Sequence, residues 1–490
     1  MSEVLLITGA SVEGGDRADL LIEDGRIAEV GIGISRADAT RIDADGLVAL
    51  PGLVDLHTHL REPGYEASET ILTGTRAAAA GGFTAVFAMP NTSPVADTAG
   101  VVEQELALGE AAGYATVQPI GAVTVGQKGE RLAELGAMAG SRARVRVFSD
   151  DGFCVWDPLI MRRALEYVKA FDGVVAQHAQ DPRLTEGAQM NEGVVSAELG
   201  LAGWPAVAEE SIIARDVLLA EHVGSRLHVC HLSTAGSVEI VRWAKSRGID
   251  VTAEVTPHHL LLTDELVRDY DPRFKVNPPL RTAEDVQAVR EGLADGTIDI
   301  VATDHAPHPA EAKACEWQAA ANGMVGLESA LRVVHQAMVS TGLIDWADVA
   351  RVLSKAPARI GRLDGHGTPL AAGQPAELTL YDPSTGGTFG GSDLRGRRYE
   401  QRRDELAQVG GDRLLRGQQE QRALLDRLGL GVDVLVVGDD ALGQAGVGPQ
   451  QRGRRVGDGA AHVVGQGDEL VDDRVELTGQ ALDLLVAQLD

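Results

Sequence analysis

The first fifty residues alternate short apolar runs with turn-forming residues. The runs are VLLITGA, ADLLIEDGRIAEV and TRIDADGLVAL. Strands that are bounded by turns in this way are typical of a small antiparallel layer. Within the second run, the dipeptide Asp24-Gly25 is a signal for a two-residue hairpin turn. The pattern therefore predicts a small β-layer over residues 1–50.

From residue 51 the pattern changes to strand-like apolar runs that alternate with helical stretches. Segments such as PLIMRRALEYVKAFDG and EESIIARDVLLAEHVG have the apolar periodicity of a helix. Between such segments lie eight strand-like runs, GLVDLHTH, FTAVFAMP, ATVQPIGAV, RVRVFSDD, GVVAQHAQ, RLHVCHLS, DVTAEVTPHH and IDIVATDHAPH. Eight consecutive strand–helix units predict an α/β fold, a (β/α)8 barrel of the TIM type over residues 51–359.

The end of the chain contains two further patterns. The run GTPLAAGQPAELTLYDP is again β-like, so residues 360–385 are predicted to join residues 1–50 in a small flanking β-sandwich. Residues 386–490 form an atypical, low-aromatic tail, and residues 400–490 contain no Phe, Trp, Tyr, Lys, Cys or Met. A stretch without aromatic residues has little to anchor a core. A helical or disordered extension and translation in a shifted frame of a GC-rich gene are both hypotheses for this tail.

Charge and cysteine content narrow the function classes. The formal net charge of −28 disfavours nucleic acid and anionic membranes as partners. An anionic small-molecule substrate would then need a local arginine. The chain has no uninterrupted run of 18 apolar residues and no basic region at its N-terminus, so we expect neither a membrane span nor a signal peptide. The three cysteines lack CxxC spacing, which indicates a reducing, cytoplasmic location.

Two histidines end the first strand-like run of the predicted barrel. His57 and His59 are two residues apart, so a strand places both on one face. At the carboxyl end of that strand they can converge on one cation. The alternative is that both are core histidines whose nitrogens bond to backbone carbonyls.

Other predicted strands also end in acids and imidazoles. These residues are Asp150, Asp151, His178, His231, Asp304, His305 and His308. TIM barrels keep their active sites at the carboxyl ends of the strands. Buried carboxylates and imidazoles are costly unless they are paired or bind metal. The cluster is sufficient for two divalent ions that share a bridging ligand, and its nitrogen and oxygen donors favour zinc, with manganese or cobalt as substitutes.

These motifs resemble those of a known family. DLHTHLREPG and ATDHAPH resemble the two signatures of the dihydroorotases, which are cyclic amidohydrolases of the amidohydrolase superfamily. Supporting segments are AMPNTSP, FSDDG, QHAQD, CHLSTAGSVE, EVTPHHL and KVNPPLR. The resemblance spans residues 1–385 and is greatest to the longer bacterial type I enzymes.

The resemblance implies a set of metal ligands. His57, His59 and Asp304 would hold one zinc ion, His178 and His231 would hold the second, and Asp151 would bridge the two. Many relatives use a carboxylated lysine as the bridge, but RVRVFSDDG has no lysine after its strand-like run. The choice of Asp151 over Asp150 rests on the resemblance, and one of the two is free to cap the following turn.

The resemblance also implies substrate contacts. Arg61 offers a bidentate guanidinium to a carboxylate, although taken alone it is equally able to pair with Glu62. The other implied contacts are Asn91, Asn277, His308, Asn322 and Gly323. His305 is expected to orient Asp304, and Cys230 to be a packed core thiol.

The implied activity is that of a cyclic amide hydrolase. It is the reversible, zinc-dependent cyclisation of N-carbamoyl-L-aspartate to L-dihydroorotate in de novo pyrimidine (UMP) biosynthesis. A metal-bridging hydroxide would be the nucleophile, and Asp304 would be the proton shuttle. Allantoinase and dihydropyrimidinase are rival activities, and a non-catalytic scaffold that supports aspartate transcarbamoylase is a rival of another class. A homo-oligomer and an association with aspartate transcarbamoylase both stay open.

Overall fold

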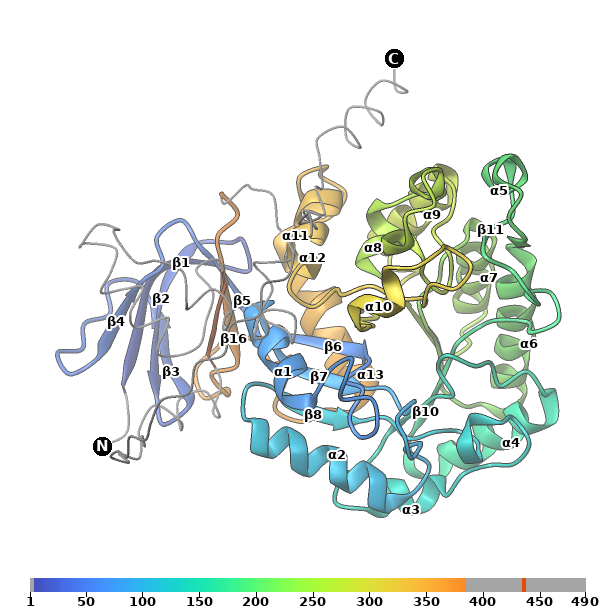
Figure 1. The fold of residues 1–490 in the computed structure, drawn as a ribbon. Helices are drawn as coiled ribbons and strands as arrows, with labels where there is room; N and C mark the ends of the chain where they lie inside the picture. Colours follow the sequence, from blue (N-terminus) through green and yellow to red (C-terminus); the bar gives the residue numbers. More distant parts are fainter. Residues whose placement is uncertain (1–3, 385–433, 438–490) are drawn as a thin grey trace, which may run out of the picture.

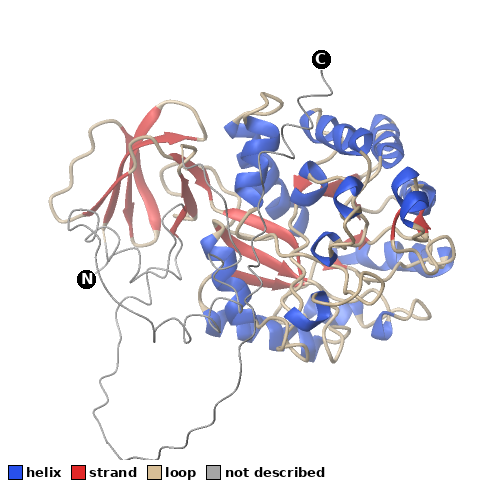
Figure 2. Cartoon of the chain, turned by 45° about the horizontal axis from the view of Figure 1, so that its top comes forward, coloured by secondary structure: helices blue, strands red, loops and turns tan. Residues whose placement is uncertain are grey.

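The computed structural model describes residues 4–384 and 434–437. Its strands fall into two parts, a mixed sheet on one side and parallel strands surrounded by helices on the other (Figures 1 and 2). The predicted tail, residues 386–490, lies outside the described residues except for one short strand at 434–437. The protein has an α/β fold, as the alternating pattern predicts.

The mixed sheet has seven strands, in the order β17-β16-β5-β1-β2-β3, with β4 also paired to β1. Its strands are β1 (Leu5–Val12), β2 (Arg17–Glu23), β3 (Arg26–Gly31), β4 (Thr40–Asp43), β5 (Val48–Pro51), β16 (Leu378–Tyr381) and β17 (Val434–Val437). The antiparallel pairing of β16 with β5 joins the segments before and after the central region, as predicted. The predicted sandwich, which needs a second layer, stays a prediction.

The hairpin signal in the first fifty residues is confirmed. Strands β2 and β3 pair antiparallel, and Glu23 faces Arg26 across the turn. Asp24 and Gly25 have φ angles of 52° and 69°. Positive φ at both central positions is what a type I′ turn requires, and Asp-Gly tolerates it.

Eight parallel strands occupy the central region, one within each of the eight predicted runs. They are β6 (Leu53–Thr58), β7 (Phe83–Ala88), β8 (Thr116–Pro119), β9 (Val147–Phe148), β10 (Val174–Gln177), β13 (Leu227–Val229), β14 (Val251–Val255) and β15 (Ile300–Val301). They pair as β6-β7-β8 and as β9-β10-β13-β14-β15. Parallel bridges from Gly121 to Phe148 and from Thr58 to His305 link the two groups at both ends.

Helices connect these strands and lie outside them (Figure 2). They are α1 (Ile71–Ala80), α2 (Ala99–Ala112), α3 (Leu135–Gly140), α4 (Pro158–Val168), α5 (Val194–Leu199), α6 (Val207–Val223), α7 (Ala235–Ser246), α8 (Pro257–Leu261), α9 (Ala283–Ala294), α10 (Ala310–Lys313), α11 (Ala330–Val334), α12 (Trp346–Ala350) and α13 (Ala356–Gly361). A short pair, β11 (Met190–Asn191) and β12 (Gly203–Trp204), lies between α4 and α6. Local signals set the helix starts: α9 begins with a capping box between Thr282 and Asp285.

Apolar side chains from the parallel strands form a core cluster of their own. It includes Leu56 of β6, Phe87 of β7 and Ile300 of β15, each at most 1% exposed. Helix α13 also contributes to this cluster. The cluster supports the carboxyl ends of the strands, where the candidate site lies. Among the described residues, no helix is both long enough and apolar enough to cross a membrane.

Candidate metal centre

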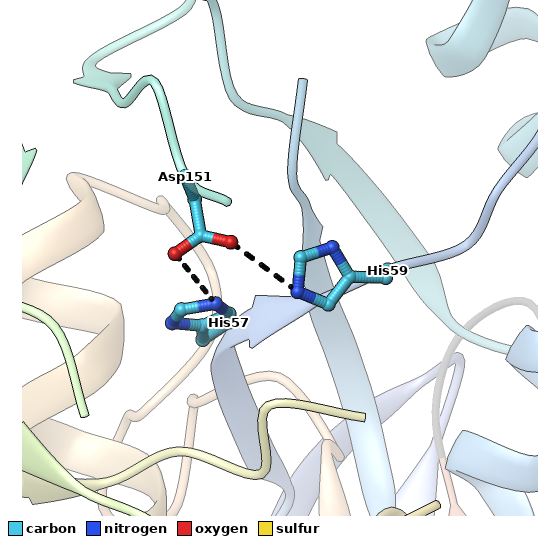
Figure 3. Close-up of side chains that lie close together, drawn as sticks. All are labelled: His57, His59 and Asp151. Carbon is cyan, nitrogen blue, oxygen red and sulfur yellow. Dashed lines mark ion pairs between the residues drawn. The ribbon is translucent and has the colours of Figure 1, made fainter. Parts of the chain in front are cut away.

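Asp151, which follows β9, lies among four histidines from three other strands. Its Oδ1 atom is 3.4 Å from His57 Nε2 and 3.3 Å from both His178 Nδ1 and His231 Nε2. Its Oδ2 atom is 3.4 Å from His59 Nε2. Figure 3 shows the carboxylate between the rings of His57 and His59. All five side chains are buried, so residues spread along the sequence meet at one point.

Asp304, which follows β15, completes the group. Its Oδ1 atom lies 2.9 Å from His59 Nε2 and 3.5 Å from His57 Nε2. Burial alone would raise the pKa of Asp304, but the positive charges of His57 and His59 and a hydrogen bond with His59 lower it well below its usual value. Asp304 is therefore ionised at neutral pH.

Three of the four imidazoles are held by their outer nitrogen. His57 Nδ1–H donates to Glu254 at 2.6 Å, and His59 Nδ1–H donates to Asn91 Oδ1 at 3.0 Å. His178 Nε2–H donates to Gln180 Oε1 at 2.7 Å. Each such bond turns the other ring nitrogen toward Asp151, and that nitrogen can bind a cation once any proton on it has left.

The donor set fits a pair of cations. His57, His59 and Asp151 form one group whose ligand atoms all lie within 4.8 Å of one another, and Asp151, His178 and His231 form another. Asp151 belongs to both groups. His57 Nε2 is buried and has no hydrogen-bond partner, an arrangement that is costly unless a cation occupies the space. This arrangement of donor atoms is the one expected of metal ligands.

The electrostatics of the cluster favour positive charge. Burial would raise the pKa of Asp151, but the charge of His57 and hydrogen bonds from His178 and His231 lower it well below its usual value. Burial would likewise lower the pKa of His57, but the charges of Asp151 and Glu254 raise it well above. Without a metal ion, the positive charge beside these acids comes from protonated histidines. A bound divalent ion would supply that charge instead.

The structure shows different contacts for Asp150 and Asp151, whose roles the sequence alone did not distinguish. Asp150 Oδ1 accepts the backbone N–H groups of Val123 and Thr124 at 2.9 and 3.0 Å. The Asp150 carboxylate therefore points away from the histidines and anchors the segment after β8. Of the two acids, Asp151 is the one that reaches the four imidazoles.

Arg61 lies just beyond the histidines, in a left-handed conformation with φ of 65°. Its Nε–H donates to Pro307 O at 3.3 Å. The alternative partner Glu62 instead accepts the backbone N–H of Ile71 at the start of α1, at 2.9 Å. Burial lowers the pKa of Arg61, and the charges of Asp304 and Asp151 oppose that effect. The guanidinium therefore lies within the electrostatic field of the centre.

The other predicted substrate contacts surround the cluster. Asn277 Nδ2–H donates to Gln180 Oε1 at 3.4 Å, while its Oδ1 atom is buried without a hydrogen-bond partner. His308 Nε2–H donates to the carbonyl of Asn322 at 2.7 Å. Burial, and next the charge of Arg61, lower the pKa of His308 to about 4, so its ring is neutral at pH 7.

Gly323 occupies a position where a side chain would collide. Its φ of 137° belongs to the region that favours glycine, and a Cβ atom there would lie 2.7 Å from the carbonyl of Ala306. The amide oxygen of Asn91 accepts His59 Nδ1–H, so its amide nitrogen is the group left for the predicted substrate contact.

Three residues of the site have a left-handed backbone conformation. His231 and Asp304 have φ of 31° and 47°, and Arg61 also has positive φ. Positive φ is uncommon for residues other than glycine and costs about 1–3 kcal/mol each. Such conformations persist only where the surroundings fix them, which is typical of functional sites.

Sequence reasoning missed some partners and misplaced another. Glu254 of β14 and His228 of β13 were not identified, although an acid in the apolar run DVTAEVT was a signal. His305 does not orient Asp304: its Nε2 lies 3.4 Å from Glu69, and its Nδ1 accepts the N–H of Gly326. Cys230 is buried in the inner core cluster, as predicted.

Comparison with solved structures defines the class. The chain resembles an L-hydantoinase (dihydropyrimidinase) from Arthrobacter aurescens, with a TM-score of 0.71 and 25% identity over 81% of this chain and 90% of that one. A dihydropyrimidinase from Brevibacillus agri shares the fold at 22% identity, with a TM-score of 0.68 over 81% and 89% of the two chains. The fold and the buried histidine–aspartate cluster are those of an amidohydrolase, a class of metal-dependent enzymes.

Sequence comparison names the family within that class. A family model described as dihydro-orotase-like matches residues 46–237. Dihydroorotases from Leifsonia xyli subsp. xyli and Streptomyces coelicolor are 78% and 74% identical to the chain. The first match covers 81% of this chain and 90% of the relative, and the second covers 77% and 88%. The chain belongs to the dihydroorotase family.

Proposed function

We propose that the protein is a dihydroorotase, which interconverts N-carbamoyl-L-aspartate and L-dihydroorotate in pyrimidine biosynthesis. The observation that carries the proposal is the position of Asp151, within 3.4 Å of four imidazoles, one of which also contacts Asp304. Family membership at 78% identity to a named dihydroorotase supports the substrate.

The domain organisation is part of the proposal. Residues 51–359 form a (β/α)8 barrel, a proposal supported by eight parallel strands and by the bridges at both ends of their pairing order. Residues 1–50 and 360–385 form the small β-domain, supported by the β16–β5 pairing. Of residues 386–490, the described strand β17 pairs with β16 in the same sheet.

The cofactor is proposed to be two zinc ions. His57, His59 and Asp304 would hold one ion, His178 and His231 would hold the other, and Asp151 would serve both. Two ligands of one tetrahedral zinc lie about 3.3 Å apart, given bond lengths of about 2.0–2.1 Å. The observed contacts between Asp151 and the histidines, 3.3–3.4 Å, match that separation. When bound, the ions supply Lewis acidity and make hydroxide available at neutral pH.

Asp304 is the residue that moves the proton. Its carboxylate is ionised and buried, and its Oδ1 atom bonds to His59. In the hydrolytic direction it accepts the proton of the attacking water, and it then delivers that proton to the ring nitrogen that leaves. In the synthetic direction the same oxygen takes the proton from the attacking nitrogen.

The residues beyond the metal ligands bind and orient the substrate. Arg61 pairs with the carboxylate that both dihydroorotate and carbamoyl aspartate carry. Asn91, Asn277 and neutral His308 add uncharged hydrogen-bonding groups, and the backbone at Asn322 and Gly323 contacts the ring. Holding the substrate at several points places its amide carbonyl over the centre and reduces the entropy lost in reaching the transition state.

Location and assembly complete the proposal. The chain acts in the cytoplasm on a small molecule, and its charge of −28 supports the exclusion of nucleic acid. A homo-oligomer and an association with aspartate transcarbamoylase are the two assemblies to be tested, by sizing the protein alone and with the transcarbamoylase.

The test is hydrolysis of dihydroorotate, allantoin and dihydrouracil by the full chain, each with and without a chelator, together with metal analysis. We expect dihydroorotate to be the preferred substrate, its hydrolysis to stop with chelator and return with zinc, and about two zinc ions per chain. Preference for allantoin or dihydrouracil would replace the assignment with a rival activity. A chain with no bound metal and no turnover would be a scaffold.

A further inference from the structure

The carboxylate of Glu254 accepts hydrogen bonds from two residues of the candidate metal centre, His57 and His231. It lies on β14 (Val251–Val255) and is fully buried. Its Oε1 atom accepts His57 Nδ1–H at 2.6 Å and also the backbone N–H of His231 at 3.1 Å. Glu254 thus holds one ligand of each proposed ion.

The remaining oxygen of Glu254 is held by a histidine on the neighbouring strand. His228 Nε2–H donates to Oε2 at 3.0 Å, and its Nδ1 atom bonds to the hydroxyl of Thr252 at 2.8 Å. Three hydrogen bonds, from His57, His228 and the backbone of His231, therefore fix the direction of the carboxylate.

We propose that Glu254 is a positioning residue that prepares the metal centre before metal arrives. It has two effects, and both rest on the metal centre of the proposed function. Its bond to His57 Nδ1–H fixes the tautomer in which Nε2 presents its lone pair to the ion. Its bond to the His231 N–H holds the backbone of that residue at φ of 31°, the conformation from which the ring reaches Asp151.

A third cation in the same place is the competing explanation. His57, Cys230 and Glu254 also bring one potential ligand atom each within 4.8 Å of one another. However, Glu254 Oε1 lies 2.6 Å from His57 Nδ1, within hydrogen-bond distance, and it also accepts the backbone N–H of His231 at 3.1 Å. The geometry favours a direct hydrogen bond, and His228 and His231 already satisfy other lone pairs of the carboxylate.

The test compares Glu254→Gln, which keeps the shape and removes the charge, with the wild-type enzyme. The readouts are the affinity for Zn²⁺ measured against a competing chelator, the absorption spectrum of the Co²⁺-loaded protein, and kcat and KM. We expect a 10–100-fold loss of metal affinity, an altered cobalt spectrum, and a fall in kcat with a small change in KM. His228→Gln, which loosens the same carboxylate, should shift metal affinity in the same direction by less.

Glu105→Gln is the matched control, because Glu105 is a fully buried acid on α2 whose hydrogen bond goes to Thr92 rather than to a proposed ligand. It should lower thermal stability at most and leave metal affinity unchanged. If Glu254→Gln binds Zn²⁺ within twofold of wild type, the positioning role is refuted.

Cys230→Ser separates the two explanations. It should leave the metal content at the wild-type value, and loss of one equivalent of metal would make Glu254 and Cys230 ligands and overturn the proposal. A wild-type chain that binds no metal would instead refute the proposed function itself.

Discussion

His59 Nε2 and Asp304 Oδ1 lie 2.9 Å apart, although 245 residues separate them in the sequence. His59 follows β6 and Asp304 follows β15, the first and last of the parallel strands. A parallel bridge between Thr58 and His305 joins the same two segments. Pairing of the first strand with the last therefore brings the proposed proton carrier to the proposed metal ligands.

Replacing Asp304 with Asn should abolish turnover while most of the metal stays bound. The amide cannot accept the proton, and a positioned acid or base contributes about 10²–10⁴-fold to rate. The measurement is kcat for dihydroorotate together with metal content. Asp295→Asn, at the exposed end of α9, is the control and should behave as wild type. An Asp304→Asn enzyme with full activity would refute the shuttle role.

Arg61→Met should raise KM for dihydroorotate by about 10–100-fold, because hydrogen bonds to charged groups contribute about 1.5–3 kcal/mol. The effect should fall mainly on KM, since the arginine is proposed to bind the carboxylate rather than the reacting amide. Steady-state kinetics check this prediction. Arg242→Met, on the exposed side of α7, serves as the control. Unchanged kcat/KM would show that the carboxylate is bound elsewhere.

The two adjacent acids should respond differently to the same substitution. Asp151→Asn should lose at least one metal ion per chain, because the bridging charge is gone. Asp150→Asn should keep both ions but lower Tm by a few degrees, because this carboxylate accepts backbone N–H groups at Val123 and Thr124. Metal analysis and thermal melts distinguish them. Equal metal loss in both variants would contradict the assignment.

Gly323→Ala should raise KM without changing metal content. A Cβ atom at φ of 137° would lie 2.7 Å from Ala306 O and 3.0 Å from His308 Nε2, so the substrate-contact segment must shift. Gly100→Ala is the matched control, since nothing lies within 4 Å of a Cβ atom there. That control should be neutral in kinetics. A Gly323→Ala enzyme with wild-type KM would show that this backbone does not contact substrate.

His366 should make stability depend on pH below neutrality. Burial lowers its pKa to about 4, and its nitrogens bond to Thr84 and Thr116. The unfolded chain binds a proton near pH 6.5, whereas the folded chain does not until about pH 4. The stability from this depressed pKa is therefore present above pH 6.5 and is lost as pH falls, by about 2 kcal/mol between pH 7 and 5.

Denaturant unfolding of the wild type and of His366→Gln at pH 7 and pH 5 checks this prediction. The variant should lose less stability than the wild type over the same interval, because it has no group to protonate. Identical losses in the two proteins would mean that His366 titrates normally in the folded state.

Local sequence patterns were enough to predict the local structure. Apolar periodicity located all eight parallel strands, and Asp24-Gly25 located the β2–β3 hairpin, because side-chain direction and turn geometry depend on neighbouring residues. The same alternation placed His57 and His59 together at the end of β6. These features need no knowledge of distant contacts.

Only the tertiary structure decided which distant groups meet. Asp151 contacts the histidines, whereas Asp150 accepts the backbone N–H of Val123. Glu62 accepts the backbone N–H at the start of α1. Glu254 accepts the Nδ1–H of His57. Two adjacent acids at the end of a strand have the same local sequence pattern. The sequence around a buried glutamate in a strand does not indicate which distant group it will bond. Those choices depend on how eight strands pair in space, which local periodicity does not encode.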